Sequence, residues 1–68
     1  MRYAVVIEKA GDNFSAYVPD LVGCVATAAT VAEVEAEIRT AIRFHLNGLR
    51  EDGLPVPEPM SLADYVET

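Results

Sequence analysis

Apolar and polar residues alternate along the first third of the chain, and this pattern predicts β-strands. Residues 2–9 are rich in β-branched and aromatic side chains, the usual composition of a strand. Tyr3, Val5 and Ile7 fall on one face of this strand, and Val6 falls on the other. A strand that is apolar on both faces is typically covered on both sides. One helix covers only one face, so we expect a partner protomer on the second.

A second strand, antiparallel to the first, is predicted at residues 14–18, because a turn-forming Ala-Gly-Asp-Asn segment separates the two. Pro19 ends this strand, since proline lacks the N–H that a ladder needs. In the turn that follows, Asp20 is expected to accept nearby backbone hydrogen bonds, and Gly23 to adopt a conformation that carries no Cβ penalty. A third, short strand of small residues is predicted at 24–28.

A long helix is predicted from about residue 31 to residue 51, because apolar residues recur there at helical spacings. Thr30 and Glu33 form a capping box at its start. Gly53 is the expected left-handed residue just past its end. Glutamates occupy its first turns, in agreement with the helix dipole at that end, and three arginines lie later: Arg39, Arg43 and Arg50.

The segment 54–60 carries prolines at every second position, 55, 57 and 59, so in a strand their missing N–H groups would lie along one edge. The segment is open to two interpretations. It is either an edge strand whose outer side is blocked against further pairing or an extended polyproline II arm. A second capping pattern, Ser61 to Asp64, then predicts a short helix to about Val66.

These elements predict an α+β fold with the order β-β-β-α-β and a short C-terminal helix. The antiparallel sheet has three to four strands, and the long helix packs on one of its faces. We expect residues 1–60 to form the domain and residues 61–68 to form a short helical tail.

The small size of the chain favours self-association. A domain of 68 residues buries only about 60% of the surface that its unfolded chain exposes, so its core is marginal. Such domains usually need disulfides, a metal or oligomerisation. The chain has a single cysteine, and Cys24 and His45 are too few for a structural zinc site. Oligomerisation remains, and a hydrophobic content of 51% agrees with it.

The charge is strongly acidic, with 11 acidic and 5 basic residues and a net charge of −6. Such a surface repels phosphate backbones, which disfavours direct nucleic-acid binding, and it attracts basic partners. No run approaches the roughly 18 apolar residues of a membrane span. The N-terminus opens directly into a strand pattern instead of a signal peptide, and a lone cysteine suits a reducing, cytoplasmic setting.

No constellation of residues predicts catalysis, a cofactor or a metal. His45 has no nucleophile or second ligand spaced to serve it. Cys24 has no cationic neighbour in sequence and is expected to be a small buried hydrophobe. Four carboxylates could in principle converge on a divalent cation: Glu8, Asp12, Asp20 and Glu33. A local structural role explains Asp12, Asp20 and Glu33 better.

Aromatic and β-branched residues on the second sheet face and in the C-terminal segment are candidates for an interface. For Tyr17, core filling and interface contact remain equally open. The candidate interface residues are Tyr3, Val5, Val6, Tyr17, Val56 and Tyr65.

Three motifs occur in order along the chain: Val-Pro-Asp-Leu-Val-Gly-Cys at 18–24, Thr-Val-Ala-Glu at 30–33 and Gly-Leu-Pro-Val-Pro-Glu-Pro at 53–59. In this order and spacing they resemble the HicB-like antitoxin family of bacterial type II toxin–antitoxin systems. The likeness covers nearly the whole chain. Six residues carry the family motif in a structural role: Pro19, Asp20, Gly23, Cys24, Thr30 and Glu33.

The resemblance implies a partial ribonuclease-H-like fold, assembly into dimers or tetramers, and a cognate HicA-type toxin. This toxin would be a small basic protein that cleaves mRNA, and the antitoxin would occlude its active site without being an enzyme. Many members carry a DNA-binding domain after the proline segment. Here nine residues follow Pro59, so a short form without that domain is expected. The alternatives are an orphan oligomeric structural or ligand-binding module with no toxin partner, and a nuclease remnant.

Overall fold

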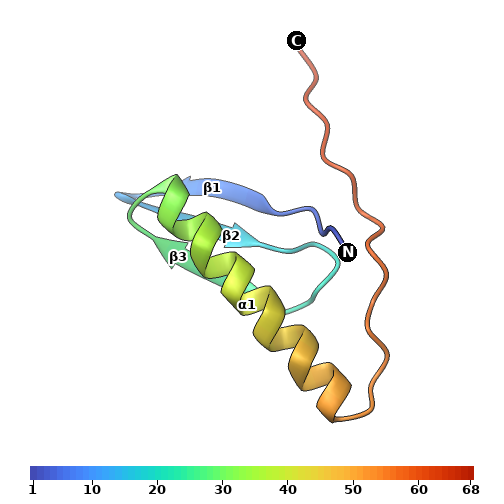
Figure 1. Ribbon diagram of the computed structural model, residues 1–68. Helices are drawn as coiled ribbons and strands as arrows, with labels where there is room; N and C mark the ends of the chain where they lie inside the picture. Colours follow the sequence, from blue (N-terminus) through green and yellow to red (C-terminus); the bar gives the residue numbers. More distant parts are fainter.

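The chain folds into a three-stranded antiparallel sheet with one long helix across one of its faces (Figure 1). The computed structural model describes residues 1–68. The elements are β1 (Val6–Ala10), β2 (Asn13–Tyr17), β3 (Val25–Ala28) and α1 (Val31–Glu51), and the strand order is β1-β2-β3. The predicted α+β class, with a single helix on one face of the sheet, is confirmed.

The strand register separates an inner from an outer sheet face. Ala16 of β2 pairs with Ile7 on one side and with Ala26 on the other, and its side chain is 2% exposed. The next residue, Tyr17, pairs with Val6 and Val25 and is 42% exposed. Side chains alternate between the faces of a strand, so the first row faces α1 and the second row faces away from it.

β1 is shorter than the strand that the pattern predicts over residues 2–9, because it begins only at Val6, opposite Tyr17. Past Tyr17, the Val18 N–H points to the β3 side, where it donates to the Cys24 carbonyl at 3.2 Å, and the next position, opposite residue 4 of the N-terminal segment, is Pro19. Pro19 has no N–H to offer. The backbone before Val6 therefore has no strand to pair with, and the predicted start of the strand was wrong.

Both ends of α1 lie where the capping residues predict them. The Thr30 hydroxyl oxygen accepts the Glu33 N–H at 3.1 Å, and the Thr30 hydroxyl also donates to the Glu33 carboxylate at 3.2 Å. At the other end Gly53 has φ 69°, its N–H bonds to the Arg50 carbonyl, and the following N–H bonds to the Leu49 carbonyl. These two bonds are those of the Schellman motif, which satisfies the last carbonyl groups of a helix.

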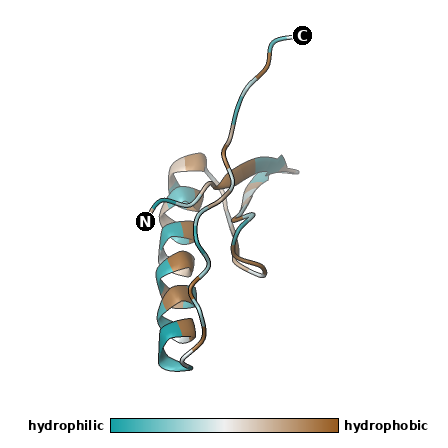
Figure 2. Ribbon diagram, turned by 90° about the vertical axis from the view of Figure 1, so that its right-hand side faces the viewer, coloured by the Kyte–Doolittle hydropathy of each residue, from teal (hydrophilic) through white to brown (hydrophobic).

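The core lies between the inner sheet face and the apolar side of α1. Figure 2 shows the helix brown toward the sheet and teal on its opposite side, as expected for a helix that buries one stripe. The core is small for 68 residues, which agrees with the marginal burial expected of so short a chain. Its fully buried members are Ala16, Val18, Leu21, Cys24, Val34, Ile38 and Leu46.

The C-terminal part of the chain contains neither a strand nor a helix. Residues 54–60, here called the arm, make no ladder with the sheet, so the edge-strand interpretation was wrong and the extended arm is observed. The helix predicted from Ser61 is also absent from residues 61–68, here called the tail. The Ser61 hydroxyl donates to Asp20 instead of capping the backbone that follows it. An isolated helix this short is also unstable in water without tertiary packing.

Candidate functional site

The turn between β2 and β3 folds back on itself and places one leucine in the core. The Leu21 N–H donates to the Val18 carbonyl, and the Cys24 N–H donates to the Leu21 carbonyl, both at 3.1 Å. Gly23 has φ 84°, a left-handed conformation that strains any residue with a Cβ. Leu21 is 1% exposed, whereas its neighbour Val22 is 91% exposed. The turn is therefore a packed unit whose leucine anchors it under α1.

Asp20 joins this turn to a segment 40 residues away. Its Oδ2 accepts the backbone N–H groups of Met60 and Ser61, both at 2.8 Å, and its Oδ1 accepts the Ser61 hydroxyl at 2.8 Å. We call these three residues the clamp. The expectation that Asp20 bonds within its own turn was wrong, because its carboxylate accepts the N–H groups of Met60 and Ser61 instead.

The clamp keeps the Asp20 carboxyl ionised. The N–H of Ser61, then the N–H of Met60 and then the Ser61 hydroxyl lower its pKa below the ordinary value of 3.8, because each bond favours the charged form. Hydrogen bonds to an ionised acceptor are stronger than neutral ones. The turn of the family motif thus fixes the point at which the tail leaves the domain.

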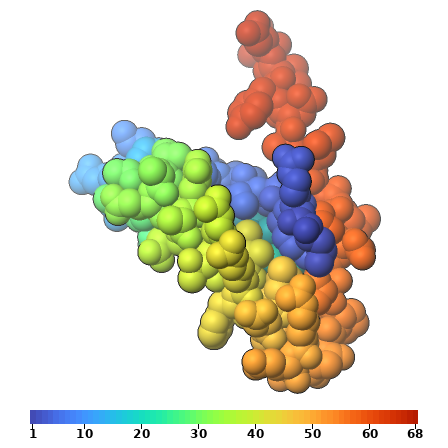
Figure 3. Space-filling model, in the orientation of Figure 1, coloured from blue at the N-terminus to red at the C-terminus, as the bar shows by residue number.

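A second contact holds the arm beside the N-terminal segment. The Tyr3 hydroxyl donates to the Pro57 carbonyl, and Val56 is half-buried against the core. In the space-filling view the N-terminal residues lie between α1 and the C-terminal segment (Figure 3). The arm therefore lies on the far side of the N-terminal segment from the helix.

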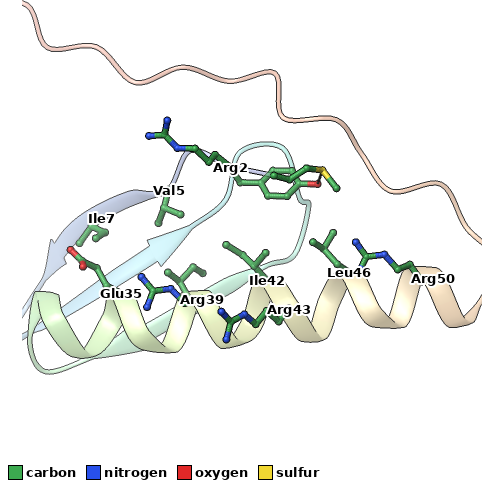
Figure 4. A pocket seen from close by; sticks show the side chains of 12 residues that line it. Arg2, Val5, Ile7, Glu35, Arg39, Ile42, Arg43, Leu46 and Arg50 are labelled. Atoms are coloured by element: carbon green, nitrogen blue, oxygen red, sulfur yellow. Dashed lines mark hydrogen bonds between the residues drawn. The ribbon is translucent and has the colours of Figure 1, made fainter.

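Between α1 and the N-terminal segment runs an open groove of about 670 Å³ (Figure 4). Val5 and Ile7 point toward the helix, and Ile42 and Leu46 point from the helix toward them. These side chains form an apolar floor. Arginines rise at its edges, three from α1 and one from the N-terminal segment: Arg39, Arg43, Arg50 and Arg2.

This basic groove holds four of the five cationic side chains of the chain. Glu35 is the only carboxylate among its lining residues. The fifth cation, Lys9, and ten of the eleven carboxylates lie elsewhere. The groove is thus positively charged, whereas the rest of the surface is strongly negative.

The outer sheet face carries an apolar row across all three strands: Val6, Tyr17 and Val25. We call it the outer row. Val25 is 64% exposed, and no helix covers this face (Figure 1). The neighbouring row, Glu8, Ser15 and Thr27, is polar. On this face β1 contributes only Val6 to the apolar row, since Ala4 precedes the strand and Glu8 is polar, and no helix of this chain covers the row.

The residues considered for chemistry do not come together. Cys24 is buried, as expected of a small hydrophobe, and burial raises the pKa of its thiol. No group of three or more histidine, cysteine or carboxylate side chains is placed to hold a metal ion. No helix in the structure combines the length and apolar character that crossing a membrane requires.

The candidate interface residues lie at four separate places. Tyr3 and Val5 line the basic groove, and Val6 and Tyr17 belong to the outer row. Val56 packs against the core from the arm, and Tyr65 of the tail is 95% exposed.

Nearly the whole chain matches a known protein family. Residues 3–68 match the family described as "HicB_like antitoxin of bacterial toxin-antitoxin system". The chain belongs to the HicB-like antitoxin family. Since this is a family of antitoxins, the chain is not an enzyme.

Two known proteins are similar to this chain. The HicB-like chain is 33% identical over 66 residues to a protein of Haemophilus phage HP1 (strain HP1c1) described as "Uncharacterized 14.9 kDa protein in rep-hol intergenic region". The match covers 97% of the chain and 50% of the phage protein, so the chain spans about half of that relative's length. It also resembles a chain of the solved structure "HicA3 and HicB3 toxin-antitoxin complex", with a TM-score of 0.74 and 30% identity over 87% of this chain and 70% of that one.

In this HicB-like chain the motif residues form the turn, the clamp and the helix start. Sequence reasoning located the turn and the helix start, but it missed the clamp and the basic groove. The clamp has no local signal, since its partners are about 40 residues apart. The groove had one: Arg39, Arg43 and Arg50 recur along one side of α1.

Proposed function

We propose that this HicB-like chain acts as an antitoxin that binds a small basic HicA-type toxin and occludes the toxin's active site. The observation that carries the proposal is the shared fold, at 30% sequence identity, with a chain of the HicA3–HicB3 complex. Inhibition by occlusion requires only a complementary surface on the antitoxin, and no catalytic residue.

The charge distribution supports a basic partner. Ten carboxylates lie outside the basic groove, and Lys9 is the only lysine or arginine there. A negatively charged surface accelerates encounter with a positively charged partner and disfavours negatively charged ones. A basic toxin is therefore attracted to most of this molecule and repelled only at the groove.

The outer row is the docking surface that we assign to the toxin. Apolar side chains exposed in a row and bordered by polar ones are typical of interaction sites. Tyr17 at its centre is 42% exposed, and tyrosine is enriched at interface cores. Glu8 stands on the same face one row away and offers a carboxylate to a basic partner.

Co-expression tests the proposal. The chain is produced together with a small basic protein encoded beside its gene, and growth and co-purification are measured. We expect the chain to relieve growth arrest and to purify with its partner. Failure of both would contradict the antitoxin function.

A pair of variants tests the surface separately. Tyr17→Ser should weaken the complex about tenfold or more, because it removes a central aromatic contact. Phe44→Ser is the comparison, since Phe44 is 81% exposed on α1 and shares a depression with Val25, at the β3 end of the outer row. A complex that is weakened by Phe44→Ser and unaffected by Tyr17→Ser would place the toxin on the helix side instead.

Self-association is a second part of the proposal. Only seven of 68 residues are fully buried, and apolar side chains remain uncovered on the sheet face, in the groove and in the tail. Domains with so small a core are commonly stabilised by assembly. Analytical ultracentrifugation measures it, and a stable monomer at all accessible concentrations would rule it out.

A further inference from the structure

The basic groove and the tail of the HicB-like chain are chemically complementary. The groove combines an apolar floor with four arginines. A suitable occupant has apolar side chains for the floor and carboxylates for the rim. The residues of the tail have both properties.

The tail exposes its apolar side chains almost completely in this structure. Leu62 is 91% exposed, Tyr65 95% and Val66 78%. Asp64 lies between Leu62 and Tyr65, Glu67 follows Val66, and the tail contains no basic residue. The spacing of Leu62, Tyr65 and Val66 is i, i+3, i+4, so one helical turn places all three on one face.

The size of the groove admits such a segment. Its helical wall runs from Glu35 to Arg50, a rise of about 22 Å along α1. Eight residues measure about 12 Å as a helix and about 26 Å fully extended. Residues 61–68 can therefore lie along the groove in either conformation.

The tail of the same chain is directed away from its own groove. The clamp fixes Met60 and Ser61 to the turn at Asp20, and the Tyr3–Pro57 contact places the N-terminal segment between the arm and the helix. From the clamp the tail runs away from α1, and its end is the part of the chain farthest from the helix (Figures 1 and 3). To reach its own groove it would have to reverse direction at once and cross the N-terminal segment.

We propose that the tail of one copy docks in the basic groove of a second copy, with Asp64 and Glu67 facing its arginines and the apolar side chains on its floor. If the exchange is reciprocal, it closes a two-fold dimer, as in other exchanges of a terminal segment. It covers the groove and leaves the outer row free for another partner.

Other occupants fit the groove less well. A basic toxin meets four arginines there, and like charges across an interface oppose binding. A nucleic-acid backbone would find the arginines, but the apolar floor offers nothing to phosphate and the remaining surface repels it. The proposal concerns two copies of this chain alone, so failure of toxin inhibition would leave it untouched.

Disulfide trapping between two distinguishable copies tests the contact. One copy carries Val66→Cys in the tail, the other carries Arg43→Cys in the groove, and a purification tag gives them different masses. Thr40→Cys is the control, because Thr40 lies one turn before Arg43 on the same helix but lines the depression at Phe44 and not the groove. The native Cys24 is buried and stays in place.

We expect a mixed disulfide dimer with Arg43→Cys, formed at least about fivefold more efficiently than with Thr40→Cys. Equal trapping at the two helix positions would overturn the proposal. A chain that carries both Val66→Cys and Arg43→Cys and closes a disulfide within the monomer would overturn it as well, because the tail would then occupy its own groove.

Charge reversal gives an independent readout. Arg39→Glu with Arg43→Glu should weaken the dimer about fivefold or more in sedimentation, and Asp64→Lys with Glu67→Lys on the same chain should restore it. All four positions are exposed, so these substitutions leave the fold intact. Dimerisation that is unchanged by the reversal, or that the second pair fails to restore, would contradict the proposed contact.

Discussion

Truncation of Leu21 tests whether the motif turn holds the fold together. Leu21 belongs to the connection between β2 and β3, yet it is 1% exposed and among the largest fully buried side chains. Replacing a fully buried leucine by alanine costs about 2–5 kcal/mol, the lost transfer free energy plus the cavity that remains. A domain of 68 residues has a total free energy of unfolding of about 3–10 kcal/mol. Leu21→Ala should therefore remove a large share of it.

The neighbouring residue provides the control. Val22 lies in the same turn but is 91% exposed, so Val22→Ala should change the free energy of unfolding by no more than about 0.5 kcal/mol. Both variants keep the backbone of the turn and differ in which side chain is shortened. The contrast therefore isolates burial from any effect on turn geometry.

Urea unfolding followed by far-ultraviolet circular dichroism measures the two variants. Protein concentration has to be fixed, because self-association would shift the apparent stability. In thermal unfolding, a loss of 2 kcal/mol should lower Tm by roughly 8–16 °C for a domain of this size. If Leu21→Ala costs less than about 1 kcal/mol, or Val22→Ala costs as much, the turn does not anchor the core in the way described.

Three further predictions concern the clamp, the helix start and the cysteine. Because the pKa of Asp20 is lowered, the clamp is complete above pH 3.8 and is lost as pH falls through the folded-state pKa. Asp20→Ala should remove amide-exchange protection at Met60 and Ser61 at neutral pH. Protection that is retained in this variant would show that the clamp is not formed in solution. Thr30→Ala should cost about 1 kcal/mol in urea unfolding through loss of the N-cap, whereas an unchanged stability would mean that the cap contributes nothing. The Cys24 thiol, buried and with a raised pKa, should resist alkylation in the native protein and react on unfolding, and rapid native labelling would contradict its burial.

Local signals predicted the local parts of the fold. Thr30 and Gly53 mark the two ends of α1 because capping depends on residues within one turn of each end. The faces of β2 followed from the alternation that ends at Tyr17. These features need no knowledge of distant segments.

The errors arose where distant segments decide the structure. The start of β1 depends on where β2 ends, because Pro19, the position opposite residue 4 in this register, has no N–H to pair. The partners of Asp20 lie in the C-terminal segment, and no spacing within the sequence indicates them. The tail carries a helix start at Ser61, but a helix this short needs a surface on which to pack.

The basic groove was the main feature of the site that sequence reasoning overlooked. Its three helix arginines were considered only for their order along the helix, after the glutamates. Their position beside the apolar stripe of α1 suggested a shared surface, but the opposite wall comes from Arg2 and Tyr3 at the other end of the chain. The packing of the N-terminal segment against α1 had to be known before the groove could be predicted.

Inhibition of a purified toxin tests the central claim most directly. The small basic protein that we propose as its toxin is incubated with RNA, and cleavage is measured as the HicB-like chain is titrated in. The antitoxin account predicts that cleavage falls to the uncatalysed level near equimolar chain, and that Tyr17→Ser shifts this titration to higher concentration. Undiminished cleavage at a large excess of folded chain would contradict it.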